Sequence, residues 1–100
     1  MYGLQGKIIA IEGQRDALAK ILLQAAEALQ QNPECIHYLV SNLPEERDAL
    51  WVSEVWTTKE AHDKSLEPDD IRALIAQARP ILEKFDEQIV LEALGGKGLP

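Results

Sequence analysis

The chain alternates between segments whose apolar residues follow the spacing of a strand and segments that follow the spacing of a helix. This order limits the folds that the chain can adopt. β-Branched residues fill 4–12, apolar residues recur every three or four positions over 14–31, and strand-like runs occupy 35–42 and 49–57. The polar, proline-containing segment 43–48 between the last two runs predicts a hairpin loop.

The next part of the chain predicts two helices. Residues Thr57 to Glu60 fit a capping box, in which the Thr57 hydroxyl accepts a hydrogen bond from the Glu60 amide. A short helix is therefore expected over about 58–65. Pro68 and the two aspartates after it begin another helix, because proline suits a first helical turn and carboxylates favour the positive end of the helix dipole.

The end of that helix and the last strand are less sharply defined by the pattern. Pro80 lies inside the apolar stripe and predicts either a kink or a break with a short continuation to Phe85. Residues 87–94 predict a fourth strand. We interpret 1–95 as one domain and the glycine-rich segment 96–100 as a flexible tail.

This order of elements is typical of an α+β fold, the ferredoxin-like split βαβ arrangement with an antiparallel sheet. A turn near the middle of the hairpin loop gives three facing pairs: Tyr38 with Glu54, Val40 with Val52, and Ile36 with Trp56. In this register both faces of the sheet are mainly apolar, whereas a solvated face would alternate to polar residues. We therefore expect helices on one face and, on the other, a second copy of the chain in a two-fold homodimer.

The composition excludes several classes of partner. A formal net charge of −7 leaves no basic surface for nucleic acid, and an anionic membrane surface would repel the chain. No segment has the length of a transmembrane helix or the pattern of a signal peptide, so a cytoplasmic protein is expected. Cys35 is the single cysteine and is expected to be a half-buried strand residue, with no disulfide within the chain. No spacing of histidines and carboxylates predicts a metal site.

Four residues are candidates for chemistry. Glu54 lies in an otherwise apolar strand, so it must stay solvated, find a hydrogen-bond donor such as Tyr38, or become protonated. It fits either a structural cross-strand pair or a proton-transfer role. Trp56 fits a core position or the wall of an aromatic pocket. His62 fits a surface position or a general base, whereas His37 is expected to be structural or interfacial.

A resemblance takes the interpretation further, and it covers nearly the whole chain. It rests on the following run: Glu54-x-Trp56, then Thr57-x-x-x-Ala61-His62-Asp63-x-Ser65-Leu66, then an apolar helix with Ala78-Arg79-Pro80. This pattern resembles the antibiotic biosynthesis monooxygenase family and is similar to its small quinol monooxygenase-like members. The resemblance implies a dimeric α+β barrel with a pocket between each sheet and its helices.

The resemblance also implies a function. Some members of the family oxidise phenols or quinols with O2 and use no metal, flavin or haem. Trp56 and His62 fall within the family's motif, and Glu54 and Tyr38 accompany them. The leading hypothesis is a cofactor-independent monooxygenase in which a small aromatic substrate binds near Trp56. His62, or Tyr38 tuned by Glu54, would help to remove the phenolic proton.

Two alternatives remain open. The same pocket would suit a non-enzymatic dimeric binding module for a small aromatic or signalling ligand. A haem-binding or haem-degrading protein is disfavoured, because related haem-degrading proteins use an asparagine on the first strand and a histidine on the later helices. Strand 4–12 has no asparagine, and the segment 68–85 has no histidine.

Overall fold

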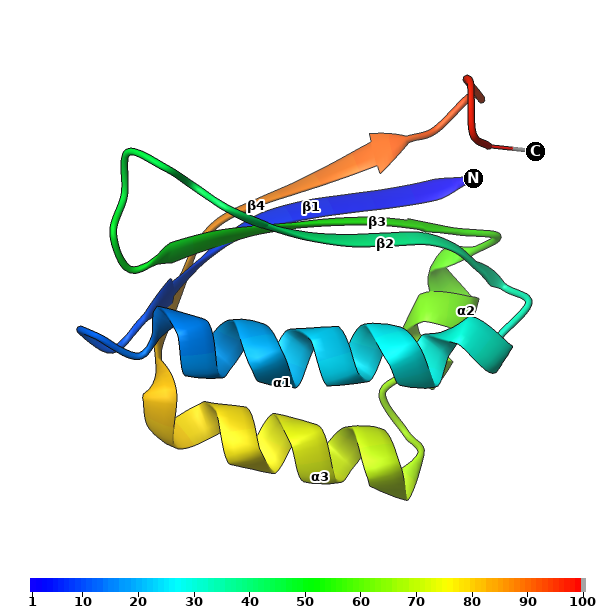
Figure 1. The fold of residues 1–100 in the computed structure, drawn as a ribbon. Coiled ribbons are helices and arrows are strands. Elements are labelled where there is room, and N and C mark those ends of the chain that lie inside the picture. Colours follow the sequence, from blue (N-terminus) through cyan, green and yellow to red (C-terminus); the bar gives the residue numbers. More distant parts are fainter. Residues whose placement is uncertain (100) are drawn as a thin grey trace.

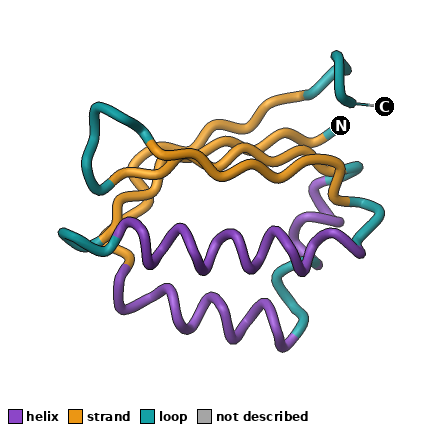
Figure 2. The backbone as a smooth tube through the Cα atoms, viewed as in Figure 1, coloured by secondary structure: helices purple, strands orange, loops and turns teal. Residues whose placement is uncertain are grey.

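The computed structural model describes residues 1–99 and shows a four-stranded antiparallel sheet with its helices on one side (Figures 1 and 2). The strands are β1 (Tyr2–Ala10), β2 (Cys35–Asn42), β3 (Ala49–Trp56) and β4 (Leu82–Glu92), in the sheet order β2-β3-β1-β4. The helices are α1 (Arg15–Ala28), α2 (Lys59–Lys64) and α3 (Asp69–Ala78). This is the α+β ferredoxin-like arrangement that the sequence predicts.

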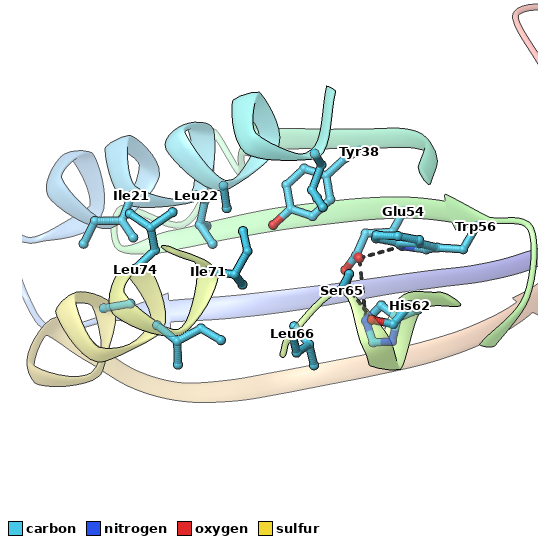
Figure 3. Close-up of a pocket in the computed structure, with 14 residues that line it drawn as sticks. Ile21, Leu22, Tyr38, Glu54, Trp56, His62, Ser65, Leu66, Ile71 and Leu74 are labelled. Atoms are coloured by element: carbon cyan, nitrogen blue, oxygen red, sulfur yellow. Dashed lines mark hydrogen bonds and ion pairs between the residues drawn. The ribbon is translucent and has the colours of Figure 1, made fainter. Parts of the chain in front are cut away.

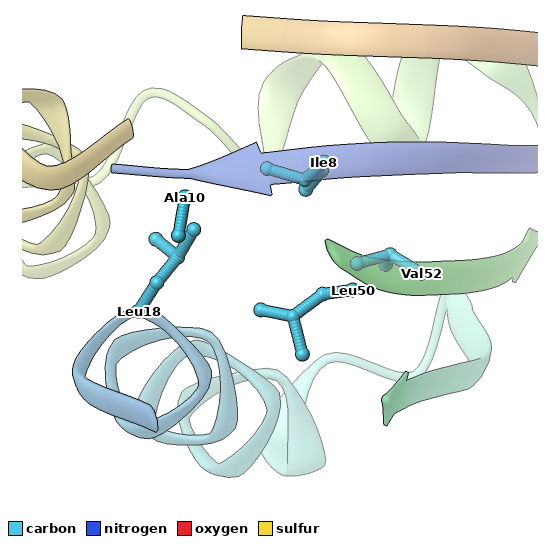
Figure 4. Close-up of a cluster of buried hydrophobic side chains, with 5 residues drawn as sticks. All are labelled: Ile8, Ala10, Leu18, Leu50 and Val52. Atoms are coloured by element: carbon cyan, nitrogen blue, oxygen red, sulfur yellow. The ribbon is translucent and has the colours of Figure 1, made fainter. Parts of the chain in front are cut away.

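Helix α1 is held against the sheet by a buried cluster (Figure 4). The cluster joins residues from β1, α1 and β3: Ile8, Ala10, Leu18, Leu50 and Val52. Burial of one large aliphatic side chain stabilises a fold by about 1.5–3 kcal/mol, so this cluster anchors the first half of α1. The helix passes into a 3₁₀ turn at Leu29–Gln31 and stops before Pro33, as predicted.

The hairpin register agrees with the prediction over most of its length. Tyr38 faces Glu54 and Val40 faces Val52, but Cys35 rather than Ile36 faces Trp56. The register shifts between Cys35 and His37, so one extra residue of β2 is accommodated at that point, as in a β-bulge. The predicted pairing of Ile36 with Trp56 is therefore wrong, although Tyr38 and Glu54 remain on the face that meets the helices.

The cap of α2 lies one residue later than predicted. The backbone of Thr58 is extended, and its hydroxyl accepts a hydrogen bond from the amide of Ala61 at 3.1 Å. Thr57 instead donates from its hydroxyl to the carboxylate of Glu34 at 3.3 Å. The predicted capping box is wrong because β3 runs through Trp56, which leaves Thr58 as the last extended residue before the helix.

Pro80 ends α3 rather than kinking it. The helix stops at Ala78, Arg79–Ile81 forms a 3₁₀ turn, and β4 begins at Leu82. The predicted helical continuation to Phe85 is wrong, and the last strand begins before the predicted range 87–94. Proline lacks the N–H that a helix interior needs, and the chain turns here to pair with β1. Of the predicted tail 96–100, Pro100 lies outside the described residues.

The face of the sheet opposite the helices is mixed rather than mainly apolar. Its centre carries polar residues: Lys7 forms ion pairs with Glu46 and Asp86, and Gln5 accepts a hydrogen bond from Trp51 Nε1 at 3.2 Å. Apolar side chains are exposed on the outer strands of this face, namely Leu39, Ile89 and Leu91. No helix within residues 1–99 is long and apolar enough to cross a membrane.

Candidate active site

A cavity of about 140 Å3 lies between the sheet and the helices, toward the end of the sheet where α2 packs (Figure 3). Most of its wall is apolar and comes from two helices: Ile21, Leu22, Ala25 and Leu29 on α1, and Ile71, Leu74, Ile75 and Ala78 on α3. Such a wall excludes water and suits a hydrophobic ligand.

The remaining wall brings together all four site residues that the sequence predicts. Tyr38 comes from β2, Glu54 and Trp56 come from β3, and His62 comes from α2. Ser65, at the end of α2, also lines the cavity, and its hydroxyl donates a hydrogen bond to the carbonyl of His62. The cavity therefore combines one polar corner with an apolar interior.

Glu54 finds its hydrogen-bond donor within its own strand. Trp56 Nε1 donates to Glu54 Oε1 at 3.0 Å, because side chains two residues apart project from the same face of a strand. The predicted donor, Tyr38, makes no such bond although it faces Glu54 across the hairpin. Trp56 is fully buried, so its N–H needs this acceptor.

The environment of Glu54 favours its protonated form. Burial raises the pKa of the carboxyl group, while the hydrogen bond from Trp56 and the nearby His62 act in the opposite direction. Its side chain is only 14% exposed. A carboxyl group with a raised pKa keeps its proton to a higher pH than an exposed carboxyl group does, which is a property of many acid–base residues.

His62 lies between two carboxyl groups. Its Nε2 atom is 3.7 Å from Glu54 Oε1, and its Nδ1 atom is 3.0 Å from Asp63 Oδ1. Lys59 lies 2.7 Å from the other oxygen of Asp63 and lowers the pKa of that carboxyl, so Asp63 stays ionised and accepts a hydrogen bond from Nδ1. With Nδ1 as the donor, Nε2 of neutral His62 carries the lone pair and faces Glu54 at a distance longer than a direct hydrogen bond.

Two aromatic rings fix the orientation of the His62 ring. Trp56 meets it edge-on with ring centroids 5.6 Å apart and an interplanar angle of 81°, and Tyr2 lies at the same distance with an angle of 47°. Tyr2 was not predicted as a site residue, because the first strand was expected to begin at residue 4. Its even position, shared with Leu4 and Ile8, would have placed it on the face that meets the helices.

Tyr38 directs its hydroxyl group into the cavity (Figure 3). Among residues 1–99 the hydroxyl has no hydrogen-bond partner, so it is available to a ligand. Burial, and then the charge of Glu54, raises the pKa of Tyr38. Tyr38 therefore stays protonated and acts as a hydrogen-bond donor to an oxygen atom of a bound molecule.

The site thus defines a ferredoxin-like α+β domain with an apolar pocket and an acid–base corner. Residues 1–99 contain no group of three metal-ligating side chains. The family model for antibiotic biosynthesis monooxygenases matches residues 1–77, so the chain belongs to that family. No curated protein matches the chain.

Solved structures agree with this assignment. A family protein from Chloroflexus aurantiacus is 39% identical to this chain and superposes on it with a TM-score of 0.91. The match covers 99% of this chain and 98% of the other. A family protein from Deinococcus radiodurans is 21% identical, with 96% and 95% coverage and a TM-score of 0.80. A third from Nitrosomonas europaea is 9% identical, with 93% and 89% coverage and a TM-score of 0.85. The last two show the fold alone.

Proposed function

We propose that the protein is a cofactor-independent monooxygenase that oxidises a phenolic or quinol-type aromatic substrate with O2. One observation carries the proposal: Tyr38, Glu54 and His62 converge on an apolar cavity walled by Trp56. Proton removal from a phenol needs a base beside the hydroxyl group, and an apolar wall holds the flat ring in place. Membership of the family supports the type of reaction.

In this proposal the Glu54–His62 pair accepts the phenolic proton. Nε2 of His62 takes the proton, and the ionised carboxyl of Glu54, 3.7 Å away, stabilises the charge that forms on the imidazole ring. Tyr38 donates a hydrogen bond to the phenolate oxygen as its charge develops. General bases of this kind contribute about 10²–10⁴ to a rate.

The substrate supplies the electrons. Its anion reduces O2, one oxygen atom bonds to the ring, and the other leaves as water. For a quinol the balanced change is quinol plus O2 giving hydroxyquinone plus water, with no external reductant. The contribution of the protein is desolvation, orientation and proton transfer.

The proposal includes a homodimer formed through the sheet face opposite the helices. Leu39, Ile89 and Leu91 are 50%, 44% and 43% exposed on that face, and burying such side chains favours association. Sedimentation should give twice the mass of the chain. Substitution Ile89→Asp should halve that mass, and a monomeric wild-type protein at high concentration would contradict this part of the proposal.

Oxygen consumption tests the enzymatic function. Wild-type protein with a menadiol-like quinol should consume O2 faster than autoxidation, and ¹⁸O2 should place one labelled atom in the product. The double variant His62→Ala with Trp56→Phe should lose this activity. The matched control is His37→Ala with Trp51→Phe, which alters the same residue types on the opposite face of the sheet and should retain it.

Two outcomes would contradict the proposal. Equal turnover by both double variants would remove His62 and Trp56 from the mechanism. Thermal stabilisation by the ligand without O2 consumption would instead support a non-enzymatic binding module.

A further inference from the structure

A second cavity, of about 160 Å3, lies beside the first on the same face of the sheet. We call it the outer compartment and define it by Gly6 on β1 together with Phe85, Glu87 and Gln88 on β4. Leu22, Tyr38 and Glu54 line both cavities. The phenol and carboxyl groups of the site therefore stand at the boundary between two adjoining spaces.

The outer compartment stays open because neither a side chain from β1 nor a helix fills it. Gly6 pairs with Val52 and Gln88, so its position faces the helices, but it has no side chain to fill the space. Helix α3 packs mainly against α1 and much less against the strands of the sheet. Phe85 is consequently 68% exposed, beside the open side of the compartment.

The size of each cavity suits one ring. An apolar cavity of about 150 Å3 holds a benzene molecule, whereas pockets for larger ligands begin at about 300 Å3. The inner cavity, bounded by Trp56 and His62, therefore holds the ring that reacts. A ligand that also enters the outer compartment would place its second ring between Gly6 and Phe85, with its hydroxyl group beside Tyr38 and Glu54.

The charges around the two cavities select against anions. Glu54 lines both with its carboxyl group, whereas Glu87 borders the outer compartment with its backbone, because it pairs with Lys7 on the opposite face of the sheet. Within residues 1–99 no lysine or arginine lines either cavity. The chain as a whole has a net charge of −7. Gln88 offers both a donor and an acceptor, which suits an uncharged carbonyl or hydroxyl group.

We infer that the outer compartment is a specificity subsite for the second ring of an uncharged, two-ring substrate. Phe85 and Gln88 contact that ring, and the lack of a cationic side chain among the described lining residues disfavours ligands with a sulfonate or carboxylate group. The inference rests on the proposed function for the chemistry of the first ring. It uses the sheet face that carries the helices, so a dimer through the opposite face leaves the subsite accessible.

Binding without O2 tests the subsite independently of turnover. Anaerobic calorimetry would compare three ligands: methylhydroquinone with one ring, menadiol with two, and 1,4-dihydroxynaphthalene-6-sulfonate with two rings and a charge on the second. Gln88→Leu and Phe85→Ala should each raise the Kd of menadiol about two- to tenfold, the size expected for one neutral contact. The Kd of methylhydroquinone should stay unchanged. Ile89→Ala, on the opposite face of β4, is the matched control and should change neither.

The charged ligand provides the second measurement. Wild-type protein should bind the sulfonate about tenfold more weakly than menadiol. Gln88→Lys should narrow that difference in Kd, because it places a cation on the face of β4 that lines the compartment. The subsite would be overturned if Gln88→Leu and Phe85→Ala changed the Kd of methylhydroquinone as much as that of menadiol. Equal Kd values of the wild-type protein for menadiol and the sulfonate would also overturn it. Binding that follows the expected pattern without O2 consumption would uphold the subsite and refute the monooxygenase. Turnover of menadiol that is unchanged in Gln88→Leu and Phe85→Ala would support the monooxygenase and refute the subsite.

Discussion

Replacing Trp56 with phenylalanine should destabilise the fold far more than the same change at Trp51. Both indoles donate a hydrogen bond, Trp56 to the carboxyl of Glu54 at 3.0 Å and Trp51 to the amide oxygen of Gln5 at 3.2 Å. Trp56 is fully buried beside the cavity, whereas Trp51 is half-buried on the opposite face. The pair therefore isolates the effect of burial and of an acidic acceptor.

The expected magnitude follows from these contacts. Above the pKa of Glu54 the acceptor is ionised, and a hydrogen bond to a charged group is worth about 1.5–3 kcal/mol. The smaller ring adds about 1 kcal/mol for the void that it leaves. Trp56→Phe should therefore lower the free energy of unfolding by about 2.5–4 kcal/mol. Since 1 kcal/mol shifts the Tm of a domain of this size by about 4–8 °C, its Tm should fall by about 10–30 °C. Trp51→Phe should cost about 1 kcal/mol.

Urea unfolding followed by circular dichroism measures both changes, with the protein concentration fixed because the proposed dimer makes stability depend on it. Trp56→Phe should lower the free energy of unfolding more above the pKa of Glu54 than below it, because above that pKa the acceptor of the lost hydrogen bond is ionised. Equal costs at Trp56 and Trp51, or a cost at Trp56 below 1 kcal/mol, would refute the reasoning.

Three further predictions concern single residues. Burial raises the pKa of Glu54 above its usual 4.5, so the folded state binds its proton more tightly and stability is lost as pH rises from that value through the folded pKa. Glu54→Gln should therefore gain stability relative to the wild type in urea unfolding as the pH rises above 4.5, and a constant difference would contradict this. Tyr38→Phe should lower kcat about tenfold with an unchanged pH profile, as a donor to an oxyanion does, whereas loss of a pH-dependent limb would identify a base. Thr58→Ala should cost about 1 kcal/mol in thermal unfolding through loss of the α2 cap, and Thr57→Ala clearly less; the reverse order would disprove the cap.

Much of the fold is predictable from local pattern. The order of strands and helices follows from apolar spacing. The pairing of Tyr38 with Glu54 follows from the hairpin loop that the polar segment 43–48 predicts. Local rules failed where neighbouring elements compete for the same residues. Thr58 replaced Thr57 as the cap because β3 extends through Trp56, and Pro80 ended α3 because the chain turns to pair with β1.

The candidate site shows the same division. The four predicted residues line one cavity, since three of them are placed by the hairpin and the fourth by the helix that follows it. Their bonds could not be predicted, because the partner of a side chain depends on distances between elements that periodicity does not contain. The sequence thus determined which polar groups enter the apolar layer between sheet and helices. Only the tertiary structure decided that Trp56 binds Glu54, that Tyr2 supports His62, and that Gly6 leaves a second space open beside them.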